Sequence, residues 1–213
     1  MHKIRFKLFR LELASGLALV LCLAAVFVPF SRRCATLRQK VLRLHVVAHS
    51  DETVDQALKL QVRDLVLAQT APLFLSAISR ADAEAALTPM LPELERAAEA
   101  LLRDAGYPYR VRASLTEMYF TTRTYDGGTL PAGHYRSLRL TIGSGQGRNW
   151  WCVMFPPMCL SAAVTDRTPV STPGDVLSAE EQDIVTHPED YEVRLKVVEW
   201  WTGLMAWLTQ SHD

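Results

Sequence analysis

Residues 137–155, SLRLTIGSGQGRNWWCVMF, contain the most regular pattern in the chain. The first six residues alternate between polar and apolar side chains, as in a strand with one buried face. The next six are rich in glycine, and the last seven, Asn149–Phe155, are typical strand formers. The segment therefore predicts two strands joined by a glycine-rich hairpin loop over residues 143–148.

The segments on either side of this pair predict a single α+β domain with a small, mainly antiparallel sheet packed by helices. The further elements are a buried strand over 41–48, a helix that begins after Ser50, helical residues 82–105, a strand over 110–115 and a helix over 191–208. Residues 161–188 are rich in Ser, Thr, Pro and Asp, and we expect them to form a long surface loop.

The last predicted helix carries two apolar stripes at helical spacing. One stripe contains Leu195, Val198, Met205 and Leu208, and the other contains Val197, Trp200, Leu204 and Trp207.

Two hypotheses account for the pairs Trp150–Trp151 and Trp200–Trp201. Either this helix covers the outer face of the strand that bears the first pair, or one aromatic side chain stays exposed as an anchor for a partner.

The amino-terminal fifth of the chain differs from the rest. The protein has 213 residues and a formal net charge of zero, which argues against a nucleic-acid-binding protein. Residues 1–43 nevertheless hold nine Lys and Arg against one acidic residue, Glu12, so the remainder is acidic. Residues 13–30, LASGLALVLCLAAVFVPF, carry no charge and as a helix approach the thickness of a bilayer core.

The apolar run has three interpretations: a cleaved signal peptide, an uncleaved signal anchor or a buried core helix. A core helix is disfavoured because the segment has no polar face. We predict that residues 1–30 are a signal peptide or signal anchor and that residues 31–213 form an exported domain.

Two patterns could bind ligands, but each has a better structural interpretation. Residues 143–147 could cradle a phosphate, yet strand formers follow them instead of a helix. His45 and His49, with Asp51 and His134, could ligate a metal, but on one strand positions 45 and 49 lie about 13 Å apart. We predict no metal and no cofactor.

Cys152 could act as a nucleophile with His134 as its base, which would make the protein an envelope hydrolase. No local signature supports this chemistry, and we predict that the protein is not an enzyme.

A disulfide between Cys152 and Cys159 is the alternative role for Cys152. A tight turn centred on Phe155–Pro156 would place these cysteines opposite each other, about 4.5–5.5 Å apart at Cα, which suits a disulfide. Pro157 offers no N–H to such a hairpin, and a wider loop would leave two packed free thiols.

Two blocks, LRLHVVAHSDETVDQALKLQVRD (residues 42–64) and the segment 119–160 with FTTRTYDGG and PAGHYRSLRLTIGSGQGRNWWCVMFPPMC, resemble the stage II sporulation protein R family. The resemblance extends to KVVEWW at residues 196–201. This chain has His49 where the family pattern has Asn, and Thr121 where it has Pro.

The resemblance implies a signalling protein of endospore-forming bacteria. Such a protein is made in the forespore and secreted into the space between the two membranes, or anchored in the membrane facing that space. There it activates a membrane-embedded aspartic protease, which removes the pro-sequence of an early mother-cell sigma factor. We predict no nucleic-acid partner and no small-molecule substrate. The resemblance assigns no functional residue. A structural envelope protein is the remaining alternative.

We expect the partner surface where the resemblance is densest, at residues 45–51 and 143–151. The candidate residues are His45, His49, Asp51, Arg139, Arg148, Asn149, Trp150 and Trp151. The alternative is that these blocks form only the core of the fold.

Overall fold

The computed structural model describes residues 2–125, 128–157 and 173–210. The main sheet has four strands in the order β2-β5-β1-β6, and a separate two-stranded sheet pairs β3 with β4. The strands are β1 (Leu42–Val47), β2 (Val111–Phe120), β3 (Arg123–Tyr125), β4 (Gly128–Leu130), β5 (Gly133–Ile142) and β6 (Asn149–Phe155). Strand β1 is parallel to β5, and the other pairings in the main sheet are antiparallel. The predicted α+β class is confirmed.

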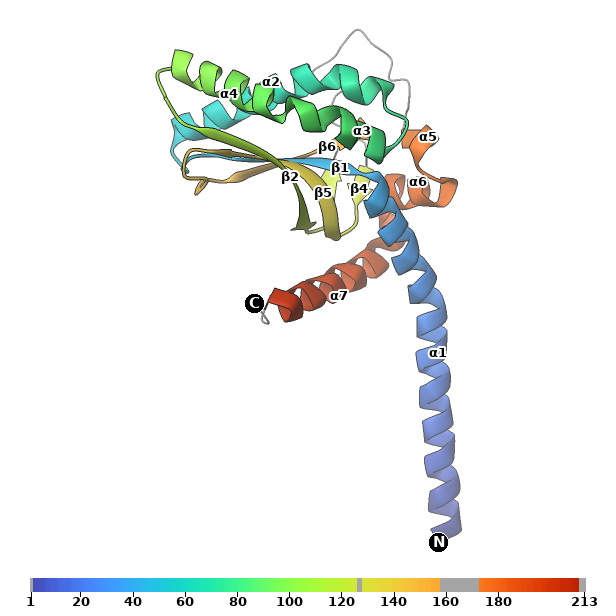
Figure 1. The fold of residues 1–213 in the computed structure, drawn as a ribbon. Helices are drawn as coiled ribbons and strands as arrows, with labels where there is room; N and C mark the ends of the chain where they lie inside the picture. Colours follow the sequence, from blue (N-terminus) through green and yellow to red (C-terminus); the bar gives the residue numbers. More distant parts are fainter. Residues whose placement is uncertain (1, 126–127, 158–172, 211–213) are drawn as a thin grey trace.

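Three helices cover one face of the main sheet (Figure 1). They are α2 (Thr53–Ser76), α3 (Arg80–Leu87) and α4 (Leu91–Asp104), with a short 3₁₀ turn at Thr88–Met90 before α4. Alternate strand residues such as Leu44, Leu138 and Met154 point toward these helices and form the largest apolar cluster. Side chains that alternate along a strand project to opposite faces, so the other face receives a different set of residues.

Strand β1 lies between β5 and β6, which is not what the sequence predicts. Residues 143–148 were expected to form a hairpin loop, but β5 and β6 do not pair with each other. Each of them pairs with β1, which lies much earlier in the chain, at Leu42–Val47. The glycine-rich segment therefore crosses the end of β1. Alternation within two strands cannot reveal a third strand inserted between them, because both arrangements bury the same alternate residues.

The second face of the sheet is covered near one end by the β3–β4 hairpin and by the carboxy-terminal helices. These are α5 (Pro173–Val176), α6 (Ala179–Thr186), a 3₁₀ turn at Pro188–Tyr191 and α7 (Glu192–Gln210). The surface loop expected over residues 161–188 is therefore wrong from residue 173 onward, and residues 161–172 lie outside the described part. Ser178 caps α6, and Ile184 is fully buried, so polar composition concealed an amphipathic helix.

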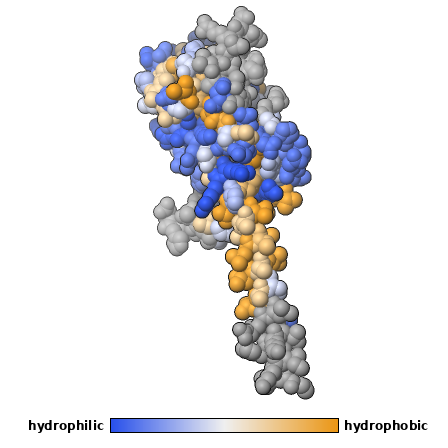
Figure 2. Space-filling model, turned by 90° about the vertical axis from the view of Figure 1, so that its right-hand side faces the viewer, coloured by the Kyte–Doolittle hydropathy of each residue, from blue (hydrophilic) through white to orange (hydrophobic). Residues whose placement is uncertain are grey.

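Helix α1 (His2–Lys40) is continuous from the apolar run into the domain. Residues 13–28 are largely exposed, and they form an apolar stalk below a mostly hydrophilic head (Figure 2). By length and composition the segment Glu12–Lys40 is able to cross a membrane. Beyond the stalk, Phe30, Cys34 and Leu37 are buried in the domain at helical spacing. The predicted boundary at residue 30 thus falls inside one helix whose last quarter belongs to the domain core.

Leu138→Ala tests the main core. Leu138 is fully buried between Leu44 and Leu115 on the neighbouring strands. Its truncation leaves a cavity, so we expect the free energy of unfolding to fall by about 2–5 kcal/mol. Urea unfolding of the full chain in detergent micelles measures the loss.

Ile78→Ala is the control for this variant, because Ile78 lies between α2 and α3 and is 75% exposed. We expect a change within about 0.5 kcal/mol. Equal losses in the two variants would contradict the assignment of the core.

Candidate partner-binding site

Residues 48–51 and 143–148 form a hydrogen-bonded unit at one end of the sheet, which we call the clasp. Because β1 and β5 are parallel, their carboxyl ends lie at the same edge, and these two segments follow them directly. The amide of Gly147 donates to the Ala48 carbonyl at 3.0 Å. The hydroxyl of Ser144 donates to the His49 carbonyl at 2.7 Å, and the Ser144 amide donates to His49 Nδ1 at 3.0 Å.

Glycine is required in the clasp because its two segments approach each other closely. A Cβ on Gly147 would lie 2.1 Å from the Ser50 carbonyl oxygen, and one on Gly143 would lie 2.3 Å from His49 Nδ1. Gly143 also has a φ of +56°, which other residues rarely adopt. The glycine run therefore allows close packing, against the His49 side chain at Gly143 and against the Ser50 backbone at Gly147. This explains its composition without a phosphate.

The outer edge of the clasp carries the exposed charges of Asp51 and Arg148. The Arg148 amide donates to Asp51 Oδ1 at 2.7 Å, and Arg148 Nε lies 3.7 Å from the same oxygen. The Asp51 side chain is 58% exposed and the Arg148 side chain 77%, so this ion pair adds little to the stability of the fold. Lys59 of α2 donates to the Arg148 carbonyl at 3.1 Å and holds the loop from below. The backbone is thus fixed while the charged groups stay accessible.

His45, Asn149 and Trp151 form a cluster on the second face of the sheet, next to the clasp. The register pairs His45 with Trp151 across β1 and β6, and the two rings stack with centroids 4.0 Å apart. His45 Nε2 and Asn149 Oδ1 lie 2.8 Å apart, which makes the imidazole the donor. Arg139 lies beside His45 on β5. The sheet register therefore brings together four of the predicted site residues.

Burial lowers the pKa of His45 below its usual 6.5. The hydrogen bond to Asn149 opposes this shift, and the positive charge of Arg139 reinforces it. His45 is only 3% exposed, so an imidazolium there would be poorly solvated. The native state consequently favours the neutral ring at neutral pH.

Arg43 is a buried residue that the sequence analysis missed. It is fully buried two positions before His45, with its guanidinium 3.8 Å from the ring centroid of Phe120 and 4.9 Å from that of Tyr135. Nη2 donates to the hydroxyl of Tyr125, while Nε and Nη1 have no hydrogen-bond partner among the described residues. Its position two residues before His45, in a strand predicted to be buried, is the sequence signal that marks Arg43, although Arg43 also belongs to the basic residues of the amino-terminal fifth.

Two of the predicted site residues are placed differently from expectation. Trp150 points to the opposite face, where the guanidinium carbon of Arg63 on α2 lies 4.4 Å from the ring centroid. This arginine, and not the last helix, packs against the outer side of the Trp150 ring. Arg139 is half-buried, and its Nε is enclosed without a hydrogen-bond partner in the described part of the chain. It is thus not the freely exposed cation that the sequence suggested.

The residues considered for catalysis and metal binding are held apart. Cys152 is 2% exposed and disulfide-bonded, so it is not a free thiolate nucleophile. His134 lies on β5, separated from β6 by β1. Cys159 lies outside the described residues, and its pairing with Cys152 stays a prediction. Within residues 2–125, 128–157 and 173–210, no group of three His, Cys, Asp or Glu side chains could hold a metal ion.

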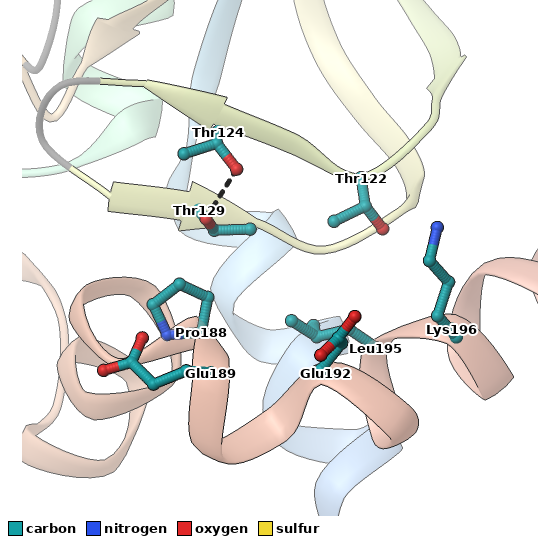
Figure 3. Close-up of a pocket in the computed structure, with 8 residues that line it drawn as sticks. All are labelled: Thr122, Thr124, Thr129, Pro188, Glu189, Glu192, Leu195 and Lys196. Atoms are coloured by element: carbon teal, nitrogen blue, oxygen red, sulfur yellow. Dashed lines mark hydrogen bonds between the residues drawn. The ribbon is translucent and has the colours of Figure 1, made fainter.

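A small pocket of about 230 Å³ lies between the β3–β4 hairpin and the start of α7 (Figure 3). It is smaller than typical small-molecule sites of about 300–1,000 Å³. The hydroxyls of Thr124 and Thr129 in its wall are hydrogen-bonded to each other at 2.9 Å. The other lining residues are Thr122, Pro188, Glu189, Glu192, Leu195 and Lys196. We assign this pocket no ligand.

Comparison with known proteins identifies relatives for the part of the chain that contains the sheet and the clasp. Residues 38–165 match the family model described as stage II sporulation protein R. The stage II sporulation protein R of Bacillus subtilis (strain 168) is 32% identical over 120 residues, which cover 56% of this chain and 54% of that protein. The chain therefore matches about half the length of this curated relative. No solved structure matches it. The segment 196–201 lies outside the matched residues.

His45 should make the stability of the fold depend on pH. In the unfolded chain His45 titrates near pH 6.5, whereas in the folded state its pKa is lower. As the pH falls below 6.5, the unfolded state takes up a proton that the folded state does not, so the free energy of unfolding decreases. We expect His45→Gln to lose less stability than the wild type between about pH 7.5 and about pH 5.5. Urea unfolding at the two pH values measures this difference.

His134→Gln is the matched control, because His134 is an exposed histidine on β5. We expect it to lose as much stability on acidification as the wild type. A wild-type loss in His45→Gln would show that the buried imidazole does not contribute.

Proposed function

Because the chain belongs to the stage II sporulation protein R family, we propose that it is an exported sporulation signal that activates a membrane-embedded aspartic protease in the mother-cell membrane. The activated protease would then process the precursor of the early mother-cell sigma factor. The protein would be made in the forespore and would act from the space between the two membranes. It would be a ligand of the protease and not itself an enzyme.

The observation that carries this proposal is the clasp, which lies within residues 38–165 and combines a fixed backbone with exposed polar groups. Ser144, Gln146 and Arg148 are all exposed at its rim. The amides of Ser144 and Gln146 are bonded to His49, which itself stacks on Tyr109 with centroids 4.2 Å apart. A surface that is already ordered loses little conformational entropy on binding.

An activator must bind the active state of its receptor more tightly than the inactive state. Exposed charges such as Asp51 and Arg148 suit this task, because they contribute to specificity while adding little to the stability of the free domain. The neighbouring cluster of His45, Asn149 and Trp151 packs β1 against β6, next to the segments that carry these charges. The site therefore separates the residues that hold the shape from the residues available to a partner.

The location of the domain also supports this function. Helix α1 carries an apolar segment able to cross a bilayer, and its last turns are buried in the domain. A retained α1 would hold the domain next to the membrane that it crossed. A protein that acts across the narrow space between two membranes needs such an exported, compact head.

The test is complementation of a strain in which the gene is deleted. We expect the sigma-factor precursor to stay uncleaved in the deletion strain and to be processed again when the full chain is restored. Arg148→Glu should lower the rate of processing by about tenfold, because loss of about 1.4 kcal/mol of binding reduces an equilibrium constant by that factor. Immunoblotting for precursor and product measures the outcome.

Arg96→Glu is the control for the charge change, since Arg96 is exposed on α4, above the opposite face of the sheet. It should restore normal processing. Normal processing in the deletion strain would refute the proposed function, whereas normal processing with Arg148→Glu would place the partner surface elsewhere.

A further inference from the structure

Helix α7 has two apolar faces, and the described part of the domain packs against one of them. Leu195 and Val198 are buried against Phe30, Cys34 and Ile184. Thr202 lies one turn further along the same side of the helix, where its hydroxyl is 3.3 Å from the hydroxyl of Tyr119 on β2. The spacing of three and four residues keeps this packed side on one line.

The opposite side of α7 is an exposed apolar stripe made of Val193, Val197, Trp200, Leu204 and Trp207. At 100° per residue these positions are centred about half a turn away from the packed side. Val193 is 76% exposed, Trp200 68% and Trp207 65%. Large apolar side chains in a continuous row at such exposure mark a contact surface. The second stripe predicted from the sequence is therefore the unpartnered one.

The position of α7 relative to α1 indicates what this stripe contacts. The ring of Tyr191, directly before α7, stacks on Phe30 of α1 with centroids 5.5 Å apart. Phe30 is the last residue of the apolar run. Thus α7 begins where α1 leaves its apolar segment. From there it runs away from α1 on the side of the sheet from which α1 projects (Figure 1).

The residues around the stripe match the chemistry of a membrane surface. The stripe contains no charged residue, and Arg194 and Lys196 flank it on its two sides. Basic side chains beside an apolar helix face can reach the lipid headgroups, and tryptophan is enriched at this interface. Trp201, 49% exposed, lies at the border of the stripe and adds a third aromatic ring.

We infer that α7 is an interfacial helix that lies on the bilayer crossed by α1, with its stripe buried at the boundary between headgroups and acyl chains. The occupant of the stripe is thus a lipid surface, and not a second copy of the chain or the receptor. Two attachments, one across the bilayer and one along it, fix the orientation of the domain. This inference depends on α1 being in the membrane and goes beyond the proposed protease activation.

The five tryptophans allow a direct test, because α1 contains none. The full chain is reconstituted in vesicles of phosphatidylcholine and phosphatidylglycerol whose acyl chains are brominated close to the headgroup. Bromine quenches tryptophan fluorescence only at short range. We expect strong quenching of the wild type, weaker quenching when the bromines lie near the ends of the acyl chains, and loss of most quenching in the double variant Trp200→Phe, Trp207→Phe.

The matched control is Trp150→Phe, which removes a tryptophan on the sheet face covered by α2 and should retain the quenching. All variants should unfold at the wild-type urea concentration, since phenylalanine preserves an apolar ring at each position.

Absence of quenching in the wild type, or equal quenching in the double variant, would overturn the inference. If quenching is absent and crosslinking instead shows a dimer that Trp200→Glu abolishes, the stripe binds a second copy. Neither result bears on processing of the sigma-factor precursor, so the two proposals are tested separately.

Discussion

The insertion of β1 between β5 and β6 is the constraint on which the rest of the structure depends. Two strands that follow each other in the chain are held apart by a third, so their connection must pass over the end of that strand. The passage leaves no room for side chains at Gly147, whose Cβ would overlap the Ser50 carbonyl. The same passage brings the residues after β1 into contact with the residues after β5, and this contact is the clasp.

The inserted strand also presents different kinds of side chain to the two faces of the sheet. Leu42, Leu44 and Val46 pack under the helices as part of the large apolar cluster. Arg43 and His45 face the other way, and both are buried on that side. Burial of a guanidinium is costly unless other groups compensate, and here aromatic rings and the Tyr125 hydroxyl surround it. This face therefore tolerates fewer kinds of neighbouring side chain than the apolar face, because a buried charged group needs polar or aromatic partners.

The carboxy-terminal segments connect this domain to the apolar helix. Lys40 of α1 pairs with the nearly buried Glu181 of α6 at 2.6 Å, and Phe30 packs with Ile184 and Leu195. These contacts make the end of α1 part of the domain and set the position at which α7 starts. The clasp and the α7 stripe lie on different elements. The proposed receptor contact and the proposed membrane contact thus have separate structural bases.

The sequence by itself determined several of the local elements and the family. Alternation and helical spacing located β1, β6 and α7 within one or two residues, and the blocks 42–64 and 119–160 agree with the matched span 38–165. Local patterns suffice there because each depends on neighbours within a few residues. Only the tertiary structure decided that β1 separates β5 from β6, that Trp150 faces α2, and which stripe of α7 remains exposed. These features depend on contacts between distant segments, and one strand or helix pattern is compatible with several partners until the packing selects one.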